Sequence, residues 1–199
     1  MPYTEMHKQE TRKRIIQSAR RLFNRNGFAD VSIDEIMGAA GLTRGGFYKH
    51  FAGKEDLYKD AVLEFICADR PEPWQARHID PAARGAALSR MIVDAYLSRD
   101  HFDDRDGSCP MIALPSDVSR GGESVKGAFR QVLEMMVDAF AANLGRGEGP
   151  PRERALGLAA MVVGGMVLAR AVDDKMLGDE LRDAARTQAL ALAGWEEAE

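Results

Sequence analysis

The feature that most constrains the fold of this chain is a helical spacing of apolar residues that persists along nearly its whole length. Within residues 11–26, for example, Ile15, Ala19 and Leu22 recur every three or four positions, as on one face of an α-helix. The strict alternation of apolar and polar residues that is typical of a half-buried strand is not found. The sequence therefore predicts an all-α protein.

Glycine and proline breaks divide this pattern into separate helical segments. The expected helices span residues 11–26, 32–40, 43–50, 54–66, 81–99, 110–119, 123–144, 151–172 and 179–195. The early segments are short and would form a three-helix head within residues 1–53. The later ones would form a C-terminal body of about six helices within residues 54–199.

The composition indicates an ordinary globular protein. With 199 residues, of which 45% are hydrophobic and 29% charged, the chain can bury a core. No uninterrupted apolar run approaches the roughly 18 residues that cross a membrane, and the first residues are charged where a signal peptide would be apolar. We therefore expect a cytoplasmic protein without a membrane partner.

Motifs for metal binding and catalysis are missing from the sequence. Cys67 and Cys109 lack the C-x-x-C spacing of zinc sites and do not form a disulfide framework. The acid-rich segment 101–110 mixes hard carboxylates with a soft thiol, which favours a solvated loop over a metal site. There is no G-x-S-x-G or P-loop motif, and the glycines of segment 145–149 are interpreted as a linker. We predict a protein that is not an enzyme and has no metal or cofactor.

The charge of the chain is unevenly distributed. Residues 1–60 carry 11 Lys and Arg against 8 Asp and Glu, whereas the whole chain has a net charge of −4. A basic first third followed by an acidic remainder indicates a head that faces nucleic acid, with a chance distribution as the alternative.

The segment 32–57 contains the motif that carries function. Ser32 and Glu35 have the spacing of a capping box at the start of one short helix, and Gly41 supplies a tight turn before the next. Two short helices joined by such a turn predict a helix-turn-helix, which places Thr43 and Arg44 at the N-terminal end of the second helix, where it meets the major groove.

At residues 41–51 the sequence reads Gly-Leu-Thr-Arg-Gly-Gly-Phe-Tyr-Lys-His-Phe, and Lys-Glu-Asp-Leu follows at 54–57. This pattern closely resembles the DNA-binding signature of the TetR family of bacterial regulators, over about residues 10–60. The resemblance implies a homodimeric repressor that binds double-stranded, palindromic operator DNA and is released by a small-molecule inducer. An activator is the alternative.

The same resemblance implies which side chains meet DNA. Thr43 and Arg44 would approach base edges, and Lys54 would hold a phosphate. Gly45 and Gly46 would let the backbone come close to DNA. Contacts to phosphates or flanking bases would come from Tyr48, Lys49 and His50, with a plain surface histidine as the alternative for His50.

Two further expectations concern the body. The sequence Ser108-Cys109-Pro110 resembles the start of a helix at which related regulators sense electrophiles or oxidants, so Cys109 is a candidate sensor, with a small buried residue as the alternative. Segments 151–172 and 179–195 combine small and large apolar residues, which predicts a two-fold four-helix bundle between subunits or, alternatively, a buried pair within one chain.

Overall fold

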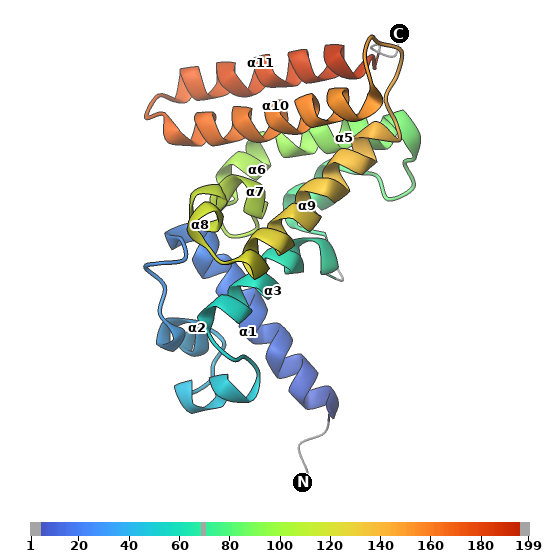
Figure 1. Cartoon of the computed structure of the whole chain (residues 1–199). Helices are drawn as coiled ribbons and strands as arrows, with labels where there is room; N and C mark the ends of the chain where they lie inside the picture. The colour runs from blue at the N-terminus through green and yellow to red at the C-terminus, as the bar shows by residue number, and fades with distance from the viewer. Residues whose placement is uncertain (1–4, 69–70, 196–199) are drawn as a thin grey trace. The chain divides into compact units, whose positions relative to one another are not determined.

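The computed structural model describes residues 5–68 and 71–195, and all regular elements in these ranges are helical (Figure 1). They are α1 (Glu5–Asn26), α2 (Ile33–Ala39), the 3-10 helix η1 (Arg44–Lys49), α3 (Lys54–Cys67), α4 (Pro73–His78), α5 (Gly85–Tyr96), α6 (Arg99–Asp103), α7 (Pro110–Ala113), α8 (Pro115–Arg120), α9 (Glu123–Ala141), α10 (Pro151–Ala171) and α11 (Lys175–Ala193). The prediction of an all-α fold is confirmed.

Several boundaries differ from the predicted ones because of local turn chemistry. The prolines at 71 and 73 follow α3, and a further helix, α4, starts at Pro73. The side chains of Glu72 and Gln75 form a capping box at its start. The helix expected from residue 81 begins at Gly85, because Asp80 organises a turn by accepting a hydrogen bond from the Ala82 amide over 2.8 Å. The helix expected at 110–119 is split into α7 and α8 at Pro115.

The chain divides into two compact units, residues 1–68 with 108–132 and residues 69–107 with 133–199. This division follows packing and differs from the predicted boundary after residue 53. The predicted functional division into residues 1–53 and 54–199 stays a prediction.

The first unit is built on an aromatic and aliphatic core. Phe23 of α1 lies edge-on to Tyr58 of α3 with ring centroids 5.0 Å apart, and Phe28 lies 4.6 Å from the same ring. Ile36 of α2 and Phe47 of η1 are fully buried. This core fixes α2 and η1 against α1 and α3.

The segment that contains α7 and α8 belongs to this first unit and is tied to it by hydrogen bonds. Asn24 donates to the Ser108 carbonyl over 2.9 Å, and Asp117 accepts from the Phe28 amide over 2.8 Å. Glu55 accepts from the Gly122 amide over 2.9 Å. Segment 108–122 is therefore held to the end of α1, the loop after it and the start of α3.

In the second unit, α10 and α11 lie side by side and pack on α5 (Figure 1). Leu158, Val162 and Met166 of α10 are fully buried. Nevertheless only 39% of the most apolar 18-residue stretch of α10 is buried, and this helix is long and apolar enough to cross a membrane, contrary to the expectation from the sequence. Buried core helices pass the same test of length and composition.

The segment 101–110, expected to be a solvated loop, is largely built into the structure. His101 lies in α6, is completely buried, and stacks on Trp74 with ring centroids 3.7 Å apart. Its Nδ1 lies 2.7 Å from the Tyr96 carbonyl oxygen, and burial lowers the pKa of His101 to about 3, so the ring is neutral at pH 7. The predicted loop is therefore wrong at this residue, because aromatic stacking replaces the solvent.

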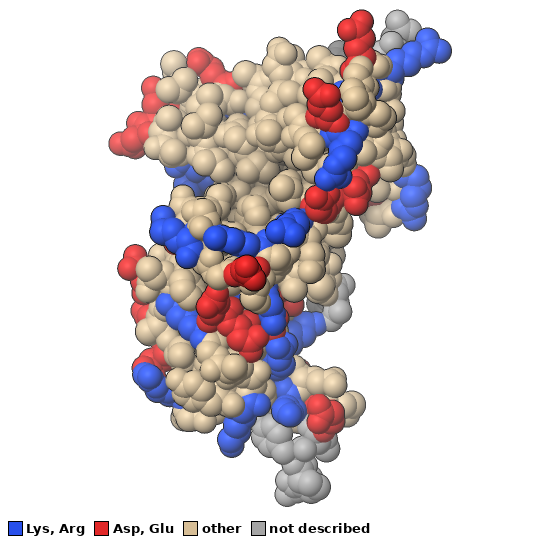
Figure 2. Space-filling model, in the orientation of Figure 1, with Lys and Arg blue, Asp and Glu red and all other residues tan. Residues whose placement is uncertain are grey.

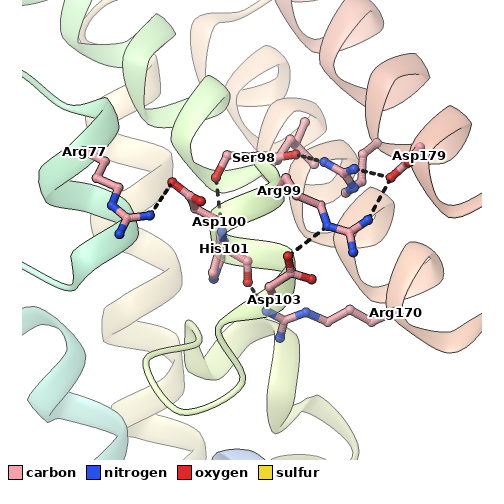
Figure 3. A network of polar contacts seen from close by, with 10 residues as sticks. Arg77, Ser98, Arg99, Asp100, His101, Asp103, Arg170 and Asp179 are labelled. Atoms are coloured by element: carbon pink, nitrogen blue, oxygen red, sulfur yellow. Dashed lines mark hydrogen bonds and ion pairs between the residues drawn. The ribbon is translucent and has the colours of Figure 1, made fainter. Parts of the chain in front are cut away.

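A polar network surrounds α6 (Figure 3). Arg170 of α10 donates to the carbonyls of His101 and Asp104, and Arg99 pairs with Asp103 over 2.9 Å and with Asp179 over 3.6 Å. These bonds satisfy the carbonyl groups at the end of α6 and fasten it to α10 and α11. Within the described residues, no group of His, Cys, Asp and Glu that could hold a metal ion is present.

Candidate DNA-binding site

The first part of the site is the capped start of α2. The Ser32 hydroxyl accepts a hydrogen bond from the Glu35 amide over 3.2 Å, and the Glu35 carboxylate accepts from the Ser32 amide over 2.7 Å. The Ser32 hydroxyl, which lies 2.7 Å from the Glu35 carboxylate, and then the Ser32 amide hold the pKa of Glu35 below its usual value. The structure thus contains the capping box that the sequence predicts, and α2 begins at a defined residue.

The turn after α2 depends on Gly41. Its φ of +67° lies in the left-handed region, which L-residues with a side chain rarely adopt. The following residue, Leu42, donates to the Met37 carbonyl over 2.8 Å and closes the turn. The chain then leaves α2 in a new direction, with Thr43 extended before η1.

The second short helix separates apolar from polar residues. Phe47 and Phe51 are buried with ring centroids 5.6 Å apart, which anchors η1 to the core of the first unit. The exposed residues of this segment are Thr43, Arg44, Gly45, Tyr48 and Lys49. Five of the predicted DNA-binding residues therefore lie on the outer surface of one short segment.

The paired glycines of η1 have no role inside the unit. A Cβ atom added at Gly45 would meet no atom within 4 Å, and one at Gly46 would meet only the Met37 side chain at 3.6 Å, an ordinary contact. Neither residue has a positive φ. Neither the backbone conformation nor the packing requires glycine at these two positions, and the close approach of this backbone to DNA stays a prediction.

His50 and Lys54 are half-buried and differ from the exposed set. Burial lowers the pKa of His50, and the nearby positive charges of Lys8, Arg12 and Lys49 lower it further. Lys54 donates to the Ala29 carbonyl over 3.3 Å and lies 4.4 Å above the Phe28 ring. Burial lowers the pKa of Lys54, although nearby carboxylates oppose this shift. Lys54 thus has internal partners that the sequence did not indicate.

An ion pair that the sequence did not predict joins the two helices of the motif. Asp34, in the first turn of α2, accepts a hydrogen bond from Nη1 of Arg44, the first residue of η1. The signal in the sequence was an acid ten residues before Arg44, at a position that the capping box does not use. On the face drawn in Figure 2, Lys and Arg side chains are mixed with a few acids around the lower end of the molecule, where α1 and η1 lie.

Cys109 lies in the same compact unit but away from solvent. It is fully buried and is the residue before α7, where its side chain makes no capping hydrogen bond. Burial agrees with the alternative of a small buried residue, and the sensor function stays a prediction.

Comparison with known proteins places this geometry in a family. The pattern of the "Bacterial regulatory proteins, tetR family" matches residues 15–61, which contain α2, η1 and the start of α3. The chain carries the N-terminal helix-turn-helix domain of the TetR family. The predicted resemblance is thereby confirmed, and TetR-family regulators are non-enzymatic transcription factors.

Curated relatives match part of the chain. The HTH-type transcriptional regulator AcrR of Shigella flexneri is 46% identical over 57 residues, which make up 29% of this chain and 26% of AcrR. The HTH-type transcriptional regulator SrpR of Pseudomonas putida is 40% identical over 72 residues, 36% of this chain and 32% of SrpR. These matches span about a quarter to a third of each relative, so the likeness to these regulators covers only part of their length.

Solved structures extend the likeness to the whole fold. A TetR-family regulator from Agrobacterium tumefaciens has a TM-score of 0.72 and 21% identity, over 90% of this chain and 97% of the other. The reduced form of NemR from E. coli has the same TM-score with 17% identity, over 90% and 95% of the two chains. At these identities the likeness shows the fold, an N-terminal helix-turn-helix followed by a helical body.

Proposed function

We propose that this TetR-family protein is a homodimeric repressor that binds a palindromic operator with Thr43, Arg44, Gly45, Gly46, Tyr48, Lys49, His50 and Lys54. One observation carries the proposal: η1 buries Phe47, with Phe51 buried just after it, and exposes Arg44, Tyr48 and Lys49. An exposed Arg at the start of such a helix matches the O6 and N7 acceptors of guanine, and Tyr and Lys match phosphates.

The experiment that tests DNA binding is selection of sites from a random double-stranded DNA pool by the purified full-length chain. We expect enrichment of a palindrome, and Arg44→Ala should relax the preference at one base pair of each half-site by about 1 to 3 kcal/mol. Tyr48→Phe should weaken binding to all sequences alike. Failure to enrich any site at low salt would refute the proposal.

The proposed dimer uses the outer faces of α10 and α11. Leu156 and Leu168 of α10 and Met176 and Leu177 of α11 are exposed although they are large and apolar. At Gly164 an added Cβ would meet no atom within 4 Å, so a neighbouring helix can approach closely. A second copy would cover this apolar surface and form a four-helix bundle.

The dimer is tested by Leu168→Glu, which places a charge on this face. We expect a monomer in sedimentation and a loss of tight operator binding, because two heads are needed to read two half-sites. Glu180→Lys, an exposed charge reversal at a polar position of α11, tests the effect of a charge change as such. Recovery of the wild-type protein in the membrane fraction would instead assign the apolar surface of α10 to lipid and contradict the cytoplasmic location that we propose.

We propose release by a small-molecule inducer, with modification of Cys109 as the alternative that the buried thiol supports less well. Binding of the inducer must favour one conformation through its own differential affinity. Operator binding that is lost with a thiol oxidant and recovered with a reductant, but unaffected in Cys109→Ser, would assign the switch to the cysteine. A reporter gene that is silenced by the protein distinguishes a repressor from an activator.

A further inference from the structure

The two acids in the first turn of α2 are unusual features of a surface that faces DNA. A carboxylate close to phosphates repels them and lowers the affinity for every sequence. Glu35 has an evident structural reason, because its carboxylate closes the capping box with Ser32. Asp34 takes no part in that box, and its carboxylate is bonded to Arg44.

Arg44 has few other restraints. It begins η1 after Thr43, whose side chain makes no capping hydrogen bond. It precedes Gly45, where an added Cβ atom would meet no atom within 4 Å. In the described part of the chain, Asp34 is the carboxylate within ion-pair distance of its guanidinium. A long arginine side chain in such open surroundings samples many rotamers, and pairing with a carboxylate on the short side chain of Asp34 reduces their number.

We propose that Asp34 is a positioning residue that orients Arg44 toward the base edges and thereby sets part of the sequence specificity. The inference rests on the proposed function of Arg44 as a base reader. Asp34 accepts one hydrogen bond from Nη1, and the remaining N–H groups of the guanidinium stay available for a bidentate contact with guanine.

The same pair discourages binding to the wrong sequence. A free arginine can turn to the phosphates, which carry no sequence information, whereas an arginine held by Asp34 is partly neutralised and directed away from them. The pair is exposed on both sides, with 59% and 56% of the side chains accessible, so it contributes little to folding stability. Its removal should therefore change specificity without unfolding the unit.

The test compares Asp34→Asn with the matched control Glu35→Gln in the full-length protein. Both variants remove one negative charge from the same turn of α2, and glutamine can still accept the capping hydrogen bond. Dissociation constants are measured at one fixed salt concentration for the selected site, for sites altered at single base pairs and for unrelated duplex DNA. Arg44→Gln and the double variant Asp34→Asn/Arg44→Gln complete a double-mutant cycle for the pair. Thermal unfolding checks that all variants are folded.

We expect Asp34→Asn and Glu35→Gln to raise the affinity for unrelated DNA by similar factors. Only Asp34→Asn should reduce discrimination, by about 3-fold to 10-fold, at the base pair where Arg44→Gln loses about 10-fold to 100-fold. In the Arg44→Gln background, Asp34→Asn should have no further effect on discrimination.

Three results would overturn the positioning function. The first is equal discrimination in Asp34→Asn and Glu35→Gln. The second is a loss of discrimination in Asp34→Asn at a different base pair, which would indicate that Asp34 contacts a base itself. The third is an equal loss of discrimination when Asp34→Asn is made in the Arg44→Gln background. A wild-type protein that selects no site refutes the proposed function instead, and intact selection by Arg44→Gln refutes the base-reading role of Arg44 together with that of Asp34.

Discussion

At the scale of single residues, the glycines of the helix-turn-helix divide into two physical classes. Gly41 is required by the backbone, because its φ is +67°. Gly45 is required by nothing inside the chain, since its backbone is ordinary and its surroundings are open. The two positions therefore respond oppositely to the same substitution.

We predict that Gly41→Ala lowers the free energy of unfolding by about 1 to 2 kcal/mol, because the left-handed conformation is strained for alanine. Gly45→Ala should leave stability unchanged or raise it by up to about 1 kcal/mol, because alanine favours a helix, and yet weaken DNA binding. Urea unfolding and DNA titration of both variants check this contrast. Gly45→Ala protein that binds DNA as tightly as wild type would contradict the close approach of this backbone to DNA.

At the scale of elements, α8 is a structural part of the DNA-binding unit. Asp117 occupies both of its oxygens, one with the Phe28 amide over 2.8 Å and the other with Arg120 over 2.9 Å. Phe28 in turn packs against Tyr58, whose pKa is raised by burial. The loop after α1 is thus fixed from a segment nearly 90 residues later in the chain.

We predict that Asp117→Ala destabilises the protein by about 1 to 3 kcal/mol, since it leaves the part-buried Phe28 amide without its acceptor. Arg120→Ala removes only the exposed ion pair and should cost no more than about 1 kcal/mol. Chemical unfolding of both variants separates the two contributions. Equal effects would show that the ion pair, and not the amide contact, is the stabilising interaction.

The stacked histidine of α6 gives that element a dependence on pH. His101 has a pKa of about 3 in the folded protein, below the usual value of about 6.5 in an unfolded chain. The unfolded state therefore binds the proton more readily, so His101 favours folding fully above about pH 6.5 and progressively less as the pH falls toward 3.

We predict that the His101 ring shows no titration by proton NMR between pH 8 and about pH 5, whereas an exposed histidine titrates in this range. The free energy of unfolding should fall by up to about 1.4 kcal/mol per pH unit below pH 6 through this group. His101→Gln should flatten this slope. A His101 resonance that titrates near pH 6.5 would contradict its burial as a neutral ring.

At the scale of the whole molecule, the proposed function depends on two heads that act together. One η1 segment is only six residues long and can read few base pairs. Two copies related by a two-fold axis would meet successive major grooves on one face of the duplex, about 34 to 36 Å apart.

We predict that an insertion of about 5 base pairs between the half-sites abolishes tight binding, because it rotates one half-site to the opposite face of the DNA. Measured affinities for the natural spacing, the insertion and a single half-site test this. A protein that binds the single half-site as tightly as the full site would contradict a dimeric reader.

The sequence by itself determined the fold class, the capping box at Ser32, the turn at Gly41 and the family, because each of these depends on local patterns of a few neighbouring residues. Only the tertiary structure decided the burial of His101 against Trp74, the attachment of Asp117 to the loop after α1 and the pairing of Asp34 with Arg44. These contacts join residues that are distant along the chain or on separate helices. Their energies arise from desolvation and packing, which depend on what surrounds a residue in space and not on its neighbours in sequence.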